Sequence, residues 1–421
     1  MDVLVAGGIF VVAYALIASE RFDRTLVAML GGLLVVILGI IDQEEAFAGI
    51  DFNVIFLLAG MMILAGGLSK TGFFEYVAGL AIQRSRGEPF RLLIILVLVT
   101  AVLAAVLDNV TTVVLLTPVT LSIARTLKVS PFPYLISQIF ASNIGGTATL
   151  IGDPPNILIG SAAGLDFGDF LVNLAPVVIV IMAVFLVILR FTFGRSMADD
   201  EDRLDLLATV DPAAAITDRL LMYRALAVLG LTIVGFLFHS VIGVEAATIA
   251  LLGATVLMIV GPLDPHESLR DIEWNTLFFF VGLFMLIEAV VHVGIVGTVA
   301  DTLADVAGGR QEVATIGILW VSALGSAIVD NIPYTATAIP IVERMIETGL
   351  EGDALWWALA LGACLGGNLT IVGASANIVV ANLAARDGHP ITFGQFFRYG
   401  SVVVLMSLVI STAYLSIRYL G

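Results

Sequence analysis

Long runs of apolar residues constrain this chain more than any other feature of its sequence. Residues 92–107 and 177–189, for example, contain no Lys, Arg, Asp or Glu. A helix that crosses a membrane needs about 20 mostly apolar residues, whereas the strands of a membrane barrel alternate apolar and polar positions. Because these runs do not alternate, the sequence predicts an all-α polytopic membrane protein.

Composition and charge exclude several classes of protein. Of the 421 residues, 59% are hydrophobic and 13% are charged, against roughly 45–50% and about 25% in soluble proteins, so a soluble enzyme is excluded. The net charge of −16 argues against nucleic acid as a partner, because nucleic-acid binding needs clustered basic residues. Cys364 is the single cysteine, which excludes an internal disulfide and a multi-thiolate metal site.

No cofactor or metal is expected, and the expected partners are the lipid bilayer and a small inorganic ion. The four histidines, His239, His266, His292 and His389, are far apart in the sequence and show no metal-ligand spacing. The chain contains no Gly-x-x-x-x-Gly-Lys-Ser/Thr phosphate loop, so it is not expected to hydrolyse ATP itself. A homodimer and a separate ATPase subunit both stay open at this stage.

The two halves of the chain repeat one pattern of residues at a constant separation. The register holds as far as Pro118 in the first half and Pro340 in the second, and then slips by one position. Beyond the slip, Gly-Gly-x-x-Thr-x-x-Gly-x-x-x-Asn occurs at 145–156 and again at 366–377. A constant register over such a distance indicates an internal duplication. The earlier pairs include Asp42/Asp264, Asn53/Asn275, Gly60/Gly282, Gly72/Gly294, Asp108/Asp330 and Asn109/Asn331.

Each half is predicted to contain about five spans, one re-entrant hairpin and one broken helix. The number of crossings is odd whether the interrupted segment is a re-entrant hairpin or two full spans. An odd number inverts the second half relative to the first, so the halves form inverted-topology repeats, a recurrent design of secondary transporters. The first repeat, 1–193, comprises a scaffold (1–90), a hairpin (91–127), a broken helix (134–163) and a last span (172–193). A polar linker, 194–224, precedes the second repeat, 225–421, with a scaffold (225–311), a hairpin (312–345), a broken helix (354–383) and a last span (400–417).

The distribution of basic residues predicts how the chain lies in the membrane. If both termini lie outside, every Lys and Arg except Arg310, Arg344 and Arg418 falls on the cytoplasmic side, those of the linker 194–224 included. Cytoplasmic loops of membrane proteins carry an excess of Lys and Arg. We therefore expect a multi-pass protein of the inner (plasma) membrane, with its N- and C-termini outside and its linker in the cytoplasm.

The first candidate site is an Asp-Asn pair in the middle of each predicted hairpin. A charged group at that depth costs several kcal/mol unless it faces protein or water. A helix-turn-helix tip at mid-membrane leaves backbone groups free, and Asn and Thr side chains can satisfy them while offering oxygens to a ligand. The simpler alternative is that Asp-Asn only turns the chain and caps the next helix. The candidate residues are Asp108, Asn109, Thr111, Thr112, Asp330, Asn331 and Thr335.

The second candidate site is the glycine-rich element of each predicted broken helix. Proline removes a hydrogen bond and clashes with the preceding turn, so Pro154 and Pro155 must interrupt their apolar segment. Asp153 has no acidic counterpart, because Ala374 stands in its place, and it can equally cap the helix that begins at Pro154. The candidate substrate-binding residues here are Thr147, Thr149, Asn156, Thr370, Ser375 and Asn377, and the candidates for proton or cation coupling are Asp108, Asp153 and Asp330.

Two segments of these sites resemble a known group of transporters. Residues 108–118 (DNVTTVVLLTP) and 143–161 (NIGGTATLIGDPPNILIGS) resemble the ArsB/NhaD group of the ion transporter superfamily, and most of all its P-type, pink-eyed-dilution-like permeases. The resemblance implies a scaffold domain and a moving transport domain that contains two re-entrant hairpins and two broken helices. The more distant dicarboxylate carriers have Ser-Asn-Thr at the hairpin tips, and the Asp-Asn pairs of this chain argue against a dicarboxylate substrate.

Two substrate classes suit carboxylates and amides at mid-membrane depth. The resemblance favours proton-coupled efflux of arsenite or antimonite by alternating access, and a Na⁺/H⁺ antiporter is the alternative; an anion channel or a dicarboxylate carrier is less favoured. An enzyme is not expected, because the stretch that ends at Asp153 lacks the first glycine of the Gly-x-Gly-Asp motif of intramembrane aspartyl proteases. In the expected mechanism, residues 91–163 and 312–383 move against the rest of the chain, and Asp108 and Asp330 carry protons.

Overall fold

The computed structural model describes residues 2–19, 21–86, 88–194, 197 and 211–421. Within these ranges the chain forms helices joined by short connections and no strand. Most of the predicted linker, namely residues 195–196 and 198–210, lies outside the described residues.

The helices of the first half of the chain are α1 (Asp2–Ser19), α2 (Arg24–Ile37), α3 (Gln43–Ala48), α4 (Phe52–Ser69), α5 (Phe73–Ser85), α6 (Pro89–Val106), α7 (Asn109–Thr126), α8 (Phe132–Gly146), α9 (Pro154–Ala163), α10 (Phe167–Asn173) and α11 (Ala175–Phe193). Those of the second half are η2 (Pro212–Ala215), α13 (Arg219–Ile242), α14 (Ala246–Val260), α15 (Pro265–Arg270), α16 (Trp274–His292), α17 (Ile295–Ala307), α18 (Gln311–Ile328), α19 (Asn331–Glu347), α20 (Gly352–Gly366), η3 (Gly367–Leu369), α21 (Ser375–Arg386) and α22 (Phe393–Tyr419).

Eight of the described helices are long and apolar enough to cross a membrane, namely α1, α4, α6, α11, α13, α16, α18 and α22. Large apolar side chains on the outer helices point away from the protein: Leu4, Phe191, Val241 and Ile417 are each more than four-fifths exposed. In water such a surface would be costly, whereas lipid tails accept it. The prediction of an all-α polytopic membrane protein is therefore confirmed.

The centre of the molecule is formed by α8 and α20, whose side chains are almost all buried. Helix α6 packs along α8, and α18 packs along α20. Glycines allow this close approach, since a Cβ at Gly145 would lie 2.2 Å from the carbonyl oxygen of Ala101, and one at Gly366 would lie 2.4 Å from that of Ala323. These positions therefore require glycine for steric reasons rather than for backbone flexibility.

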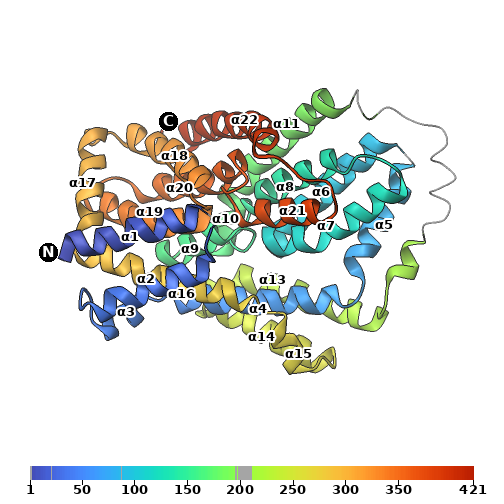
Figure 1. Ribbon diagram of the computed structural model, residues 1–421, viewed down its shortest axis with the longest axis horizontal. Coiled ribbons are helices and arrows are strands. Elements are labelled where there is room, and N and C mark those ends of the chain that lie inside the picture. The colour runs from blue at the N-terminus through green and yellow to red at the C-terminus, as the bar shows by residue number, and fades with distance from the viewer. Residues whose placement is uncertain (1, 20, 87, 195–196, 198–210) are drawn as a thin grey trace.

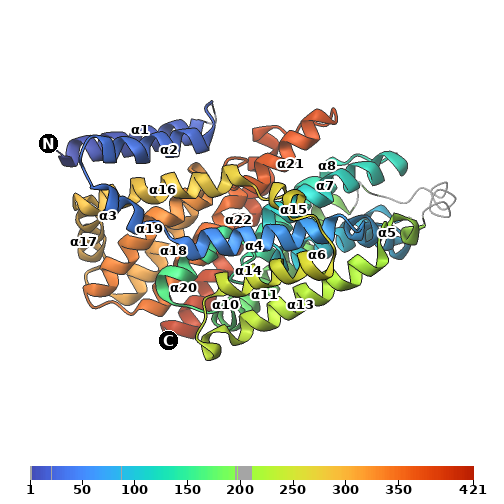
Figure 2. The same cartoon turned by 90° about the horizontal axis from the view of Figure 1, so that it is seen from below.

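The scaffold is made by exchange of helices between the halves. Helix α2 packs on α16, and α14 packs on α4, as Figures 1 and 2 both show. Gly32 and Gly60 lie at these contacts, where a Cβ would lie 2.8 Å from the Gly282 carbonyl oxygen and 2.7 Å from the Ala250 carbonyl carbon, respectively. Neither predicted scaffold, 1–90 or 225–311, packs only against itself.

The longest helices run along the long axis of the molecule (Figure 1). The N- and C-terminal ends lie toward one end of this axis, and α5 lies at the other. The order of helices from α1 to α9 recurs from α13 to α21, and the single helix α22 occupies the place of α10 and α11. The inverted orientation of the two halves stays a prediction.

Candidate functional site

The two predicted hairpins each break at their Asp-Asn pair. Asp108 caps α7 by accepting a hydrogen bond from the backbone N–H of Thr111 at 2.7 Å. Asp330 caps α19 in the same way, with the backbone N–H of Ile332 at 3.0 Å. Each aspartate therefore caps the helix that follows it, which was the simpler of the two roles considered for the Asp-Asn pairs. It leaves carboxylate oxygens available for other partners.

Each hairpin tip is anchored to the broken helix of its own half. The backbone N–H of Asn109 donates to the carbonyl oxygen of Gly152 at 2.9 Å, and that of Asn331 donates to Gly373 at 3.1 Å. Thr149 and Thr370 add a second link, since their hydroxyls donate to carbonyl oxygens of α6 and α18 at 2.6 Å. A hairpin and the adjacent unwound segment therefore form one hydrogen-bonded unit in each half.

Asn156 and Asn377, which match in the two halves, bind the unwound backbone through their side-chain amides. Asn156 Nδ2 donates to the carbonyl oxygens of Thr147 and Thr149 at 3.1 and 2.8 Å. Asn377 Nδ2 donates to those of Gly367 and Thr370 at 2.8 and 2.9 Å. Because a carbonyl freed from its helix must find another donor when buried, these two amide groups are already engaged. The hydroxyls of Thr147 and Thr335 likewise donate to backbone carbonyl oxygens.

Asn143 of α8 joins the two halves at the centre, and sequence reasoning missed it. Its Nδ2 donates to Oδ1 of Asn368 and Oδ1 of Asn377, both at 2.9 Å. Its Oδ1 accepts from Nδ2 of Asn109 at 3.1 Å. The only signal in the sequence was a lone asparagine within an apolar run, since its counterpart in the second half is Cys364.

Three buried polar atoms at this centre have no hydrogen-bond partner within the structure described. They are Oδ1 of Asn109, Oγ1 of Thr112 and Nδ2 of Asn368. A buried polar group without a partner costs about 1–3 kcal/mol. Two acceptors and one donor are thus left for a ligand or water near the hairpin tip of the first half.

Asp153 is fully buried and makes a contact between the halves. Nδ2 of Asn331 donates to both of its carboxylate oxygens, at 3.1 and 3.3 Å. Although Asp153 precedes α9, its side chain makes no capping hydrogen bond. No Lys or Arg among the described residues forms an ion pair with it. A negative charge on Asp153 therefore has no described Lys or Arg beside it and is balanced by hydrogen-bond donors such as the amide of Asn331.

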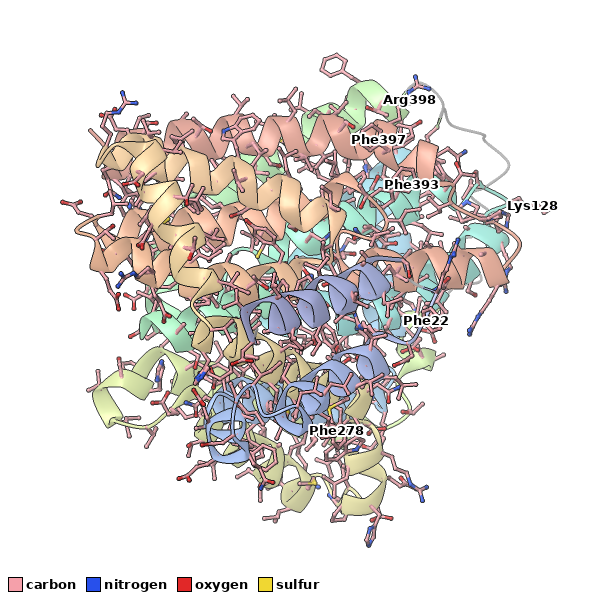
Figure 3. The ribbon with its side chains drawn as sticks, turned by 60° about the vertical axis from the view of Figure 1, so that its left-hand side comes forward. Phe22, Lys128, Phe278, Phe393, Phe397 and Arg398 are labelled. Atoms are coloured by element: carbon pink, nitrogen blue, oxygen red, sulfur yellow. The ribbon has the colours of Figure 1, made fainter. Side chains whose placement is uncertain are left out.

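A cavity of about 400 Å³ opens beside the second hairpin tip, and Arg24 reaches into it. Nη1 of Arg24 lies 3.3 Å from Oδ2 of Asp330 and donates to Oγ of Ser375 at 2.5 Å. Ser375 in turn donates to Oδ2 of Asp330 at 2.6 Å. Phe22, labelled in Figure 3 beside the end of α1, and Glu273 also line this cavity.

Arg24 was read from the sequence only as a marker of the cytoplasmic side. Its partner Asp330 lies 306 positions away along the chain, and no local pattern connects them. The position of Arg24 in the other half is occupied by Ala246, so the repeat did not single it out. The guanidinium also lies over the ring of Phe279, 5.2 Å from its centroid, a geometry that stabilises a cation.

A second cavity, of about 230 Å³, lies beside the first hairpin and is lined by Thr111, Lys70, Asp271 and Glu273. Lys70 and Asp271 form an ion pair at 2.9 Å. Glu273 lines both cavities. Among the predicted site residues, Thr111, Asp330 and Ser375 line a cavity.

The three candidate coupling aspartates have separate partners, namely the Thr111 N–H for Asp108, Asn331 for Asp153, and Arg24 with Ser375 for Asp330. Within the described part of the chain, no group of three or more His, Cys, Asp or Glu is placed to hold a metal ion. A hard cation prefers several oxygen ligands together. In this conformation the aspartates do not provide such a cluster.

Comparisons with known proteins extend over nearly the whole chain. Residues 14–362 match the model of the CitMHS family, described as a citrate transporter. A protein of Mycobacterium tuberculosis (strain H37Rv), described as an uncharacterized transporter, is 45% identical over 99% of this chain and 98% of its own length. The human P protein is 34% identical over 99% of this chain and 60% of its own length. The predicted likeness to P-type permeases is thereby confirmed, while the assignment to ArsB/NhaD stays a prediction.

Two solved structures share the fold. The YdaH transporter of Alcanivorax borkumensis has a TM-score of 0.62 at 14% sequence identity and covers 99% of this chain and 98% of its own. MtrF of Neisseria gonorrhoeae, described with a class of antimetabolite efflux pumps, has a TM-score of 0.65 at 14% identity and covers 99% and 95%. At this identity the likeness concerns the fold alone.

Proposed function

The chain belongs to the CitMHS family of membrane transporters, and from this premise we propose that it is a proton-coupled secondary active transporter that works by alternating access. That it is a multi-pass transporter and not an enzyme follows from its family and its relatives. The proposal concerns the coupling ion, the substrate and the moving part. Its moving part is the pair of hairpin and broken-helix units, residues 91–163 and 312–383.

The observation that carries the substrate proposal is the group formed by Arg24, Ser375 and Asp330 in the large cavity. An accessible guanidinium binds carboxylates in a bidentate manner. Ser375 is the first residue of α21, and no side chain caps this helix, so its free N–H groups favour an anion as well. We propose a small carboxylate anion as the substrate, which agrees with the description of the family as citrate transporters.

The aspartates at the hairpin tips argue against an anionic substrate, because like charges repel. Asp330 is paired with Arg24 at 3.3 Å, which offsets this repulsion. A carboxylate substrate that engages Arg24 would compete with Asp330 for the guanidinium. Protonation of Asp330 would remove that competition, and this links anion binding to proton uptake.

Asp153 is the second group proposed to carry a proton. It is fully buried, its carboxylate accepts hydrogen bonds from the amide of Asn331 at 3.1 and 3.3 Å, and no described Lys or Arg forms an ion pair with it. A buried charge without a counter-ion is costly, so the transport step is expected to take place with Asp153 neutral. Asp153→Asn should therefore preserve exchange of substrate across the membrane and abolish its accumulation by a pH gradient.

Efflux of arsenite or antimonite is kept as the second candidate because of the unpartnered atoms of Asn109, Thr112 and Asn368. A neutral trihydroxy species could donate to the two oxygens and accept from the amide. A Na⁺/H⁺ antiporter is less favoured by the geometry, since the three aspartates have separate partners.

The test is a flux assay in proteoliposomes with an imposed pH gradient, in which labelled citrate, arsenite and Na⁺ are offered separately. We expect citrate flux that collapses in Arg24→Ala and is partly kept in Arg24→Lys, with proton movement reported by a pH dye inside the vesicles. Arsenite flux of equal size in wild type and Arg24→Ala would favour the second candidate. Citrate flux that is indifferent to the pH gradient would refute proton coupling.

A further inference from the structure

A small cavity of about 40 Å³ lies between α9 and the connection from α13 to α14. Its wall includes Ile157 and Ser161 of α9, His239 near the end of α13, and Glu245 with Ala246 at the start of α14. Most of this wall is tightly packed, since Ile157 is 3% exposed and Ala246 is 8% exposed. None of these residues belongs to the site described above.

Four of the twelve residues that line the small cavity have a counterpart that lines the large cavity. In the constant register of the two halves, His239 matches Ile17 and Ala246 matches Arg24. In the register that holds beyond the slip, Ile157 matches Ile378 and Ser161 matches Asn382. All four counterparts, Ile17, Arg24, Ile378 and Asn382, line the large cavity.

The two cavities therefore lie at related positions in the two halves and differ in volume. One has a volume of about 400 Å³ and the other of about 40 Å³. If the halves are inverted in the membrane, the two places face opposite sides. A transporter that alternates between two such states would open one cavity while it closes the other.

We infer that the small cavity is the closed second entrance of the transport path, formed where α9 packs against the start of α14. This inference rests on the proposed alternating access. When this entrance opens, α9 moves away from the end of α13 and the start of α14. In the predicted orientation the closed entrance faces outside and the open one faces the cytoplasm.

His239 gives the second entrance a chemistry that the first lacks. Its Nδ1 donates to the carbonyl oxygen of Val244 at 3.1 Å, while its Nε2 is buried without a partner in the structure described. An unpartnered buried nitrogen opposes closure, because water can satisfy it only when the entrance opens. The counterpart Ile17 has no such requirement, so the two entrances are not energetically equivalent.

The matched positions Ile157 and Ile378 allow a direct test by cysteine labelling. Cys364 is the single native cysteine and is fully buried, so the native chain serves as the labelling blank. Full-length Ile157→Cys and Ile378→Cys proteins are reconstituted in liposomes, and a charged thiol reagent is supplied on both faces. Without substrate, we expect fast labelling at Ile378→Cys and slow labelling at Ile157→Cys.

The decisive measurement combines each reporter with Arg24→Ala, which removes the contact between the start of α2 and the second hairpin tip. The rate at Ile157→Cys is expected to rise about tenfold, as a minor state of a few per cent becomes a major one, and the rate at Ile378→Cys is expected to fall. Ala247→Cys, at the same cavity, serves as the second reporter if Ile157→Cys fails to fold. Rates that stay unchanged at Ile157→Cys and Ala247→Cys would overturn the inference.

The labelling result is independent of the substrate and of proton coupling. Reciprocal changes at the two reporters with no citrate or proton flux would support the second entrance and refute the proposed function. Proton-coupled flux with labelling confined to Ile378→Cys would support the function and refute this entrance.

Discussion

Replacing Arg24 with alanine removes the contact that holds the second hairpin tip against the scaffold. In the present state Arg24 contacts Asp330 at 3.3 Å and Ser375 at 2.5 Å. Its counterpart in the other half is Ala246, which has no charge to offer. If the two states exchange the roles of the halves, the Arg24–Asp330 pair exists in one state and is broken in the other. Arg24→Ala should therefore shift the equilibrium away from the present state.

The size of the shift can be worked from the geometry. A hydrogen bond to a charged group contributes about 1.5–3 kcal/mol, while an exposed ion pair contributes about 0–1 kcal/mol. The side chain of Arg24 is 31% exposed and that of Asp330 is 6% exposed, which places the pair between these limits. We take about 2 kcal/mol, which corresponds to a roughly 30-fold change in the ratio of the two states.

The assay is the ratio of thiol-labelling rates at Ile378→Cys and Ile157→Cys, which reports the ratio of the two states. Arg24→Ala is expected to lower this ratio roughly 30-fold, and Arg24→Lys, which keeps the charge without the planar fork, is expected to lower it less. A double-mutant cycle with Asp330→Asn isolates the pair. Strictly additive effects of Arg24→Ala and Asp330→Asn would refute the reasoning.

Three further predictions concern the buried network. Gly366→Ala should lower the thermal stability of the purified protein strongly, because the added Cβ would lie 2.4 Å from a backbone oxygen of α18, whereas Gly297→Ala, with open space around it, should not. Asn156→Ala should cost about 2–4 kcal/mol, since two buried carbonyl oxygens lose their donor at 3.1 and 2.8 Å, and its melting temperature should fall by several degrees. Asn331→Asp should abolish transport at neutral pH and recover part of it under acid, because a second carboxylate would face Asp153 where the amide now donates; flux that does not depend on pH would contradict this.

The sequence was a good guide to where the helices break. The Asp-Asn pairs and the Gly-Gly and Pro-Pro elements act through local chemistry. The second helix of each hairpin begins directly after Asp108 or Asp330. The sequence does not show which polar side chains form hydrogen bonds with the backbone groups that the helix breaks leave free. Asn156 and Asn377 look like ligand residues in the sequence, but their amide nitrogens are engaged with the carbonyl oxygens that the breaks leave free. The asparagines that bind the free backbone groups of a broken helix are of the same residue type as those that bind a ligand.

Contacts across the duplication were also invisible in the sequence. The search for matched pairs favours residues that recur in both halves, and Arg24 and Asn143 do not recur. Their partners lie more than two hundred positions away, at Asp330 and Asn377. Hydrophobic periodicity predicts which residues are buried, and an internal repeat predicts that the halves share an architecture. Neither predicts which unmatched side chain contacts which hairpin tip.

Three polar residues of the first half have smaller or less polar counterparts in the second. The pairs are Arg24 and Ala246, Asn143 and Cys364, and Asp153 and Ala374. In the fold all three reach across to the second half: Arg24 contacts Asp330, Asp153 accepts from Asn331, and Asn143 donates to Asn377. The matched residues of the duplication thus form the helix breaks and the close glycine contacts, which both halves need alike.

The unmatched residues have a different consequence, because they all act on one hairpin and broken-helix unit. In a perfectly symmetric pair of halves the two states of alternating access would have the same free energy. Here Arg24 places a positive charge, and Asp153 a titratable group, against the second tip. Protonation and anion binding at that tip therefore change the free energies of the two states unequally. A ligand shifts such an equilibrium only by the difference between its affinities for the two states.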